Sequence, residues 1–132
     1  MKRILPDTNA YSGYLMGDEQ VLHALSKAEV VYMSVFVLGE LLAGFKGGSR
    51  ERWNKELLYA FLSKPTVVVL NATSETSEIF ADVMFNLKKS GKPIPMNDAW
   101  IASHSLETGS VLITCDKRFK AVPGLRLWYY VE

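Results

Sequence analysis

Three aspartates stand where an α/β fold would place a ligand site. Asp7 follows the segment 2–6, which reads as a short first strand, and Asp116 follows the apolar segment 111–114. Asp98 lies at the start of a segment with helical periodicity, where the helix dipole favours an anion. In an open parallel sheet, ligands bind beyond the carboxyl ends of the strands, where the strand order reverses. A single aspartate at such a position is more often a turn or capping residue, so only their joint occurrence indicates a site.

A fourth acid, Glu40, lies in a segment, 35–45, that is apolar nearly all the way round. This composition predicts a helix buried on most faces, where an ionised carboxylate is costly without a positive partner. Lys46, the nearest basic residue along the helix, is six positions away and is therefore not an i+3 or i+4 partner. A divalent cation would supply the missing charge. The alternatives are a neutral glutamic acid and a side chain that reaches solvent.

Four carboxylates with no histidine nearby in the sequence are typical of a site for one or two hard cations, Mg²⁺ or Mn²⁺. Cys115 is the only cysteine and the chain has two histidines, so neither a thiolate zinc site nor a histidine-rich centre is indicated. A metal held by carboxylates lowers the pKa of bound water, orients that water and neutralises charge on a phosphodiester. Without metal the acids repel one another, which raises some of their pKa values.

The elements that must position these acids alternate between strands and helices. The segment 2–6 reads as a short first strand, and further strands are predicted at 30–33, 66–70, 111–114 and 125–131. The segment 66–70 is expected to be the clearest buried strand, and 125–131 is expected to lie at an edge of the sheet. Periodicity predicts helices at 10–15, 21–28, 35–45 after an N-cap at Ser34, 53–62, 79–87, and 98–108 after an N-cap at Asn97. The alternation predicts a single α/β domain over residues 1–132: three α/β/α layers around a mainly parallel, roughly five-stranded sheet.

Composition narrows the class of protein. A chain of 132 residues that is 48% hydrophobic can bury a core, which argues against disorder. The formal net charge of +1 is too small to indicate a nucleic-acid binder through bulk electrostatics. No apolar run approaches the roughly 20 residues of a membrane span, and the N-terminus does not read as a signal peptide. We therefore expect a cytoplasmic protein with no membrane partner.

Several motifs occur in a fixed order along the chain. They are Asp7-Thr8-Asn9, Gly39-Glu40-Leu41 with Gly44, Asn97-Asp98 with Ile101-Ala102, Thr114-Cys115-Asp116 with Phe119, and Pro123-Gly124-Leu125. In this order and spacing they resemble the PIN-domain family, and more narrowly the VapC-like toxins of prokaryotic toxin–antitoxin pairs. One departure is Pro6, where an aliphatic residue is common. Proline lacks a ladder donor, so we expect that strand end to be unpaired on one side.

The resemblance implies a PIN-like fold and a Mg²⁺- or Mn²⁺-dependent endoribonuclease that acts on structured RNA such as tRNA or rRNA. Carried onto this sequence, the catalytic and metal-binding residues are Asp7, Glu40, Asp98 and Asp116. Family members vary at the position of Asp116, which could act through water. Asn9 and Thr114 would orient the carboxylates. The resemblance also implies that the protein forms a homodimer. It further implies a cognate antitoxin, which would bind to the region 45–62.

An RNA substrate would need local positive charge on a nearly neutral chain. The first candidates are Lys46, Arg50 and Arg52 around a Gly47-Gly48 turn, because arginine grips phosphate bidentately. A second group consists of Lys88, Lys89 and Lys92. For any one of these residues, the alternative is an ordinary solvated surface.

Other functions fit the same fold class. A phosphatase of the haloacid dehalogenase kind also has an aspartate after its first strand. Its chemistry requires a second acid two residues later, where this chain has Asn9. A response-regulator receiver would need paired acids at the first strand, and they are not evident. A catalytically silent PIN-fold binding module is the third alternative. The presence of all four acids argues against it.

Overall fold

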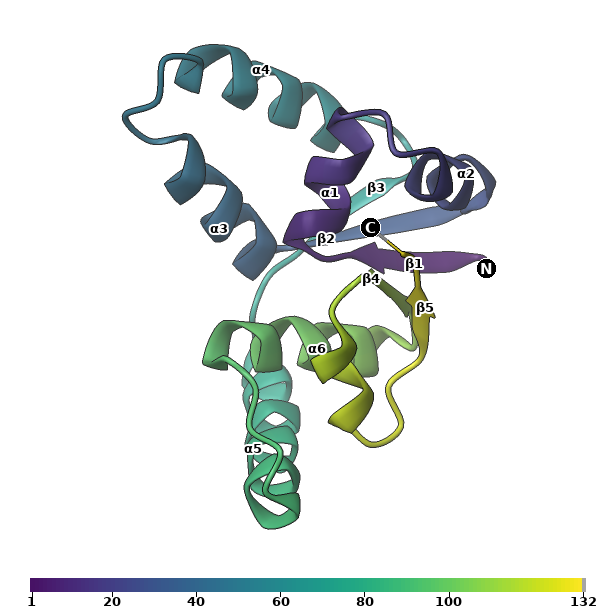
Figure 1. The fold of residues 1–132 in the computed structure, drawn as a ribbon, viewed down its shortest axis with the longest axis vertical. Helices are drawn as coiled ribbons and strands as arrows, with labels where there is room; N and C mark the ends of the chain where they lie inside the picture. Colours follow the sequence, from purple (N-terminus) through teal and green to yellow (C-terminus); the bar gives the residue numbers. More distant parts are fainter. Residues whose placement is uncertain (132) are drawn as a thin grey trace.

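The computed structural model describes residues 1–131 and contains a parallel five-stranded sheet (Figure 1). The strands are β1 (Arg3–Pro6), β2 (Val30–Ser34), β3 (Val67–Leu70), β4 (Val111–Thr114) and β5 (Leu127–Tyr129). Their order is β3-β2-β1-β4-β5, and each neighbouring pair is parallel. The order reverses between β1 and β4, so the carboxyl ends of these two strands define the expected position of a ligand site.

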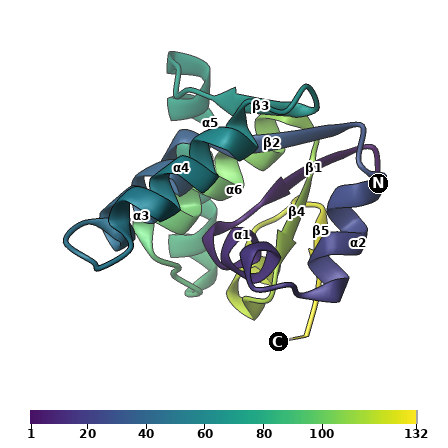
Figure 2. The same cartoon turned by 90° about the horizontal axis from the view of Figure 1, so that it is seen from above.

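Helices cover both faces of the sheet. They are α1 (Thr8–Leu15), α2 (Glu19–Lys27), α3 (Val35–Phe45), α4 (Glu51–Leu62), α5 (Ser74–Ser90) and α6 (Met96–Thr108), with a short 3₁₀ helix, η1 (Lys117–Ala121). Helices α1 to α4 lie on one side of the sheet, and α5, α6 and η1 lie on the other (Figures 1 and 2). The three-layer α/β/α prediction is confirmed. Within residues 1–131, no helix combines the length and apolar character needed to cross a membrane.

The centre of the sheet forms the core. Ile4 and Leu5 of β1 and Leu112 and Ile113 of β4 are fully buried, because layers of helix cover both faces of these strands. Pro6 pairs with Ile113 of β4, whereas the register between β1 and β2 ends at Ile4. The strand end is therefore paired on one side only, as the missing N–H of proline predicts. The backbone N–H of Asp7 continues on the β4 side and donates to the Ile113 carbonyl at 3.1 Å.

Two local predictions were wrong. The segment 66–70 was expected to be the clearest buried strand, but β3 is an edge strand in which Val68 is 43% and Val69 is 39% exposed. An apolar, β-branched run specifies a strand, but its place in the sheet depends on tertiary partners. Asn97 was expected to cap α6, but the N-cap is Pro95 and the helix begins at Met96. The Asn97 amide instead donates to the Phe36 carbonyl at 3.5 Å.

Candidate active site

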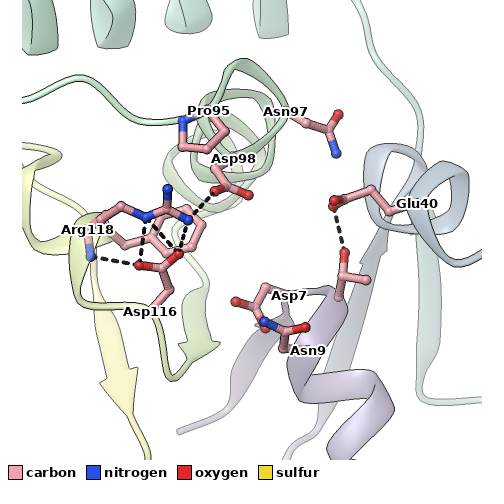
Figure 3. Close-up of a pocket in the computed structure, with 10 residues that line it drawn as sticks. Asp7, Asn9, Glu40, Pro95, Asn97, Asp98, Asp116 and Arg118 are labelled. Carbon is pink, nitrogen blue, oxygen red and sulfur yellow. Dashed lines mark hydrogen bonds and ion pairs between the residues drawn. The ribbon is translucent and has the colours of Figure 1, made fainter. Parts of the chain in front are cut away.

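The four predicted acids line one pocket of about 280 Å³ at the carboxyl edge of the sheet (Figure 3). They come from four separate elements: Asp7 from the β1–α1 junction, Glu40 from α3, Asp98 from the first turn of α6, and Asp116 from the N-cap of η1. The remaining lining residues are Thr8, Asn9, Pro95, Asn97, Arg118 and Phe119. The pocket lies where the strand order reverses, so the topology accounts for the meeting of acids that are far apart in the sequence.

Asp7 is the most buried of these acids, with 6% of its surface exposed. As the N-cap of α1, it accepts the Ala10 N–H at 2.8 Å through Oδ1, and it accepts the Thr114 hydroxyl at 2.6 Å through Oδ2. Burial raises the pKa of Asp7 from 3.8 to about 6; the hydrogen bonds from Thr114 and Ala10 oppose this shift, and the charges of Asp98 and Asp116 add to it. The carboxylate is therefore fixed in position and costly to ionise without a cation.

Thr114 connects two of the acids. Its hydroxyl donates to Asp7 and accepts the Asp116 N–H at 3.0 Å, and its side chain is fully buried at the end of β4. This geometry is that of a residue that orients a carboxylate. Asn9, the other residue predicted for this task, is exposed and lines the pocket.

Arg118 was not among the residues singled out in the sequence. Its guanidinium holds Asp116, with Nε at 3.1 Å from both carboxylate oxygens and Nη2 at 2.6 Å from Oδ2. Nη2 also lies 3.6 Å from Oδ2 of Asp98. The hydrogen bonds from Arg118 lower the pKa of Asp116, whereas burial and then the charge of Glu40 raise the pKa of Asp98. Its position two residues after Asp116 was the one signal in the sequence.

Glu40 lies in the pocket, but the reason given for it from the sequence was wrong. The residue is exposed, and its Oε1 accepts the Thr8 hydroxyl at 2.7 Å. Helix α3 buries only Val37 and Leu41 among its eleven residues, so its apolar composition does not reflect burial on most faces. The Glu40 charge therefore meets solvent and a hydroxyl, and it does not need a cation to be tolerated.

The donor set of the pocket fits a hard divalent cation, because every candidate ligand is a carboxylate oxygen. Within residues 1–131, no group of three or more Asp, Glu, His or Cys side chains lies close enough together to hold a metal ion. The positive charge beside Asp98 and Asp116 comes instead from Arg118. Binding a metal by all the acids would therefore require Asp116 to share or leave its guanidinium partner.

The predicted RNA-binding residues Lys46, Arg50 and Arg52 surround the α3–α4 turn, and none lines the acidic pocket. Lys46 lies 3.9 Å from Glu51, and Arg52 lies 3.2 Å from Glu56. The guanidinium of Arg50 lies over the Trp53 ring at 5.8 Å from its centroid. Lys46 and Arg52 thus have acidic partners, and an RNA role for the three residues stays a prediction.

Comparison with known proteins decides the family. The PIN domain model matches residues 4–125. This chain belongs to the PIN-domain family. The phosphatase and receiver alternatives are thereby set aside.

Two relatives of this PIN-domain chain are ribonucleases by name. It is 29% identical to Ribonuclease VapC2 of Rickettsia felis over 107 residues, which cover 80% of this chain and 78% of the relative. It is 31% identical to Ribonuclease VapC1 of Haemophilus influenzae strain R2866 over 109 residues, or 82% and 79% of the two chains. The fold is similar to that in the crystal structure of VapBC2 from Rickettsia felis bound to a promoter DNA fragment, with a TM-score of 0.86, 23% identity, and 97% and 98% of the two chains covered.

Proposed function

We propose that this protein is a metal-dependent endoribonuclease that cuts structured RNA and serves as the toxin of a VapBC-like toxin–antitoxin pair. The observation that carries the proposal is the meeting of Asp7, Glu40, Asp98 and Asp116, from four separate elements, in one pocket. The names of the two ribonuclease relatives support hydrolysis of RNA. The oxygen-only donor set favours Mg²⁺ or Mn²⁺ as the cofactor.

Asp7 and Asp98 are the strongest candidates for direct metal contact, with Glu40 and Asp116 beside them. When bound, the metal would neutralise charge on the scissile phosphodiester and acidify an attacking water. The chain itself provides positioning: Thr114 holds Asp7 at 2.6 Å, and Thr8 holds Glu40 at 2.7 Å. The burial of Asp7 lowers the local dielectric constant and strengthens its attraction to a cation.

The partners follow from the same proposal. A cytoplasmic antitoxin would cover the region around α4, where Trp53 and Tyr59 are each 52% exposed. Exposed aromatic side chains of this kind are typical of protein interfaces. A homodimer is a separate expectation from the family resemblance, and sedimentation of the purified chain tests it.

The proposal is tested by incubating total tRNA and rRNA with the purified chain, free of any partner, in Mg²⁺, Mn²⁺ or EDTA. Asp7→Asn and Asp98→Asn are run beside it. We expect discrete products that need the metal and disappear in both variants. Cleavage that survives both substitutions would refute this site. Absence of cleavage by folded protein would favour the catalytically silent binding module.

A further inference from the structure

A second pocket, of about 310 Å³, adjoins the acidic one and has the opposite charge. The connector between α5 and α6 and the helix η1 form its walls, and its lining residues are Lys92, Pro93, Ile94, Lys117, Arg118, Lys120 and Ala121. Four of these are cationic, and no described lining residue is acidic. Arg118 lines both pockets, so the two adjoin at its side chain.

The three lysines of this basic groove, Lys92, Lys117 and Lys120, are exposed. Within residues 1–131, none of them has an acidic partner within the 4.0 Å that defines an ion pair. This distinguishes them from Lys46 and Arg52 at the α3–α4 turn, whose charges are paired with Glu51 and Glu56. The groove therefore has unpaired positive charge available for an anionic ligand.

The groove is also held in shape. Helix η1 begins at its N-cap Asp116, which accepts the Arg118 N–H at 2.9 Å, and it is anchored by Phe119, which is 1% exposed. Lys120 lies over the Tyr129 ring at 4.9 Å from its centroid. On the opposite wall, Ile94 is buried beside Pro93. The backbone that carries the lysines is thus fixed before a ligand arrives.

We propose that the basic groove binds the phosphates of the RNA strand next to the phosphodiester that is cut. The inference rests on the proposed ribonuclease function and identifies where its substrate lies. Four carboxylates in the neighbouring pocket repel a polyanion, so the attraction must come from an adjacent surface. Lysines that neutralise phosphates release counterions and attract RNA of any sequence.

Arg118 joins the two sites. Among residues 1–131, it is the one cation that lies against both the acids and the groove. A strand lying on Lys117 and Lys120 would pass Arg118 before its next phosphate reaches Asp98 and Asp116. The groove would thereby set the direction in which the strand crosses the acidic pocket.

Binding of a fluorescent single-stranded RNA of mixed sequence tests this inference. The full chain carrying Asp98→Asn is used in EDTA, so that binding is measured without cleavage. The groove variant is Lys92→Gln/Lys117→Gln/Lys120→Gln. The matched control is Lys2→Gln/Lys27→Gln/Lys64→Gln, which removes the same charge near the amino ends of β1, β2 and β3. Melting temperatures verify that both variants are folded, and a Lys-to-Arg version of the groove variant should retain binding.

We expect the groove variant to bind RNA about tenfold or more weakly at low salt, and the control to bind less than about threefold more weakly. The slope of log K against log salt should become shallower by about 0.7 for each phosphate that the groove no longer neutralises. Equal weakening in the two variants would overturn the proposal, because bulk charge would then explain binding. Reduced affinity for polyglutamate but not for RNA would also overturn it and assign the groove to an acidic polypeptide. Failure of the ribonuclease proposal is seen separately, as wild-type protein that does not cut RNA with metal.

Discussion

The carboxylates on the two walls of the acidic pocket have different partners: neutral hydrogen-bond donors on one wall and a cation on the other. On the wall formed by β1, α1 and α3, Asp7 and Glu40 receive hydrogen bonds from hydroxyls and a backbone N–H. On the wall formed by α6 and η1, Asp98 and Asp116 face the guanidinium of Arg118 (Figure 3). The pKa of Asp7 rises to about 6 through burial, whereas Arg118 lowers the pKa of Asp116. The environment of each carboxylate, and not its residue type, decides how strongly it needs a cation.

The largest predicted difference between the two walls is in catalysis. Asp7→Asn should lower the rate of RNA cleavage by on the order of 10³-fold, since removing a metal ligand forfeits several kcal/mol of transition-state stabilisation. Asp116→Asn should cost only about tenfold, because Arg118 already balances this carboxylate. Single-turnover cleavage of the same RNA at saturating Mg²⁺ gives both ratios. Equal reductions in rate would remove the distinction between the walls.

The second prediction concerns stability against pH without metal. Because the pKa of Asp7 is raised from 3.8 to about 6 in the folded chain, the folded state binds more protons than the unfolded state between these values. The contribution of Asp7 to stability is complete below pH 3.8 and is lost as the pH rises through about 6. Between pH 4 and pH 7 this loss should amount to roughly 2–3 kcal/mol.

Urea unfolding in EDTA at a series of pH values measures this loss, with Asp7→Asn as the comparison. The difference between the two proteins isolates Asp7, because Asp98, Asp116 and His104 titrate in both. Wild type should become less stable relative to the variant as the pH rises. A constant difference in unfolding free energy between the two proteins from pH 4 to pH 7 would show that burial does not raise the pKa of Asp7.

The third prediction sharpens the comparison at the contact between the walls. Thr114→Val removes the hydroxyl that donates to Asp7 and accepts the Asp116 N–H. Affinity for Mn²⁺ should fall by about 10–100-fold, as is usual when a residue that orients a metal ligand is removed. Isothermal titration calorimetry measures the affinity. Thr114→Ser keeps the hydroxyl and should bind Mn²⁺ nearly as wild type does; equal weakening in both variants would show that the hydroxyl does not account for the loss of affinity.

These differences also mark what the sequence could predict. The positions of Asp7 and Asp116 after strands are local features, and the topology of a parallel sheet brings such residues together. The exposure of Glu40, the edge position of β3 and the partner of Asp116 depend on which elements pack together in three dimensions. Apolar periodicity along one segment carries no record of that packing, so it predicted the elements of the fold better than their surroundings.

The smallest predicted effect concerns Arg118, the cation on the wall formed by α6 and η1. Arg118→Ala frees Asp116 from three hydrogen bonds and Asp98 from a neighbour at 3.6 Å. Without RNA, the variant should bind Mn²⁺ about fivefold more tightly, a modest gain because solvent screens the exposed guanidinium. Calorimetric titration measures the gain. Arg126→Ala is the control, since Arg126 is exposed and donates to the Gly109 carbonyl at 3.5 Å. Weaker Mn²⁺ binding by Arg118→Ala alone would mean that Arg118 organises the carboxylates for the metal and does not compete with it.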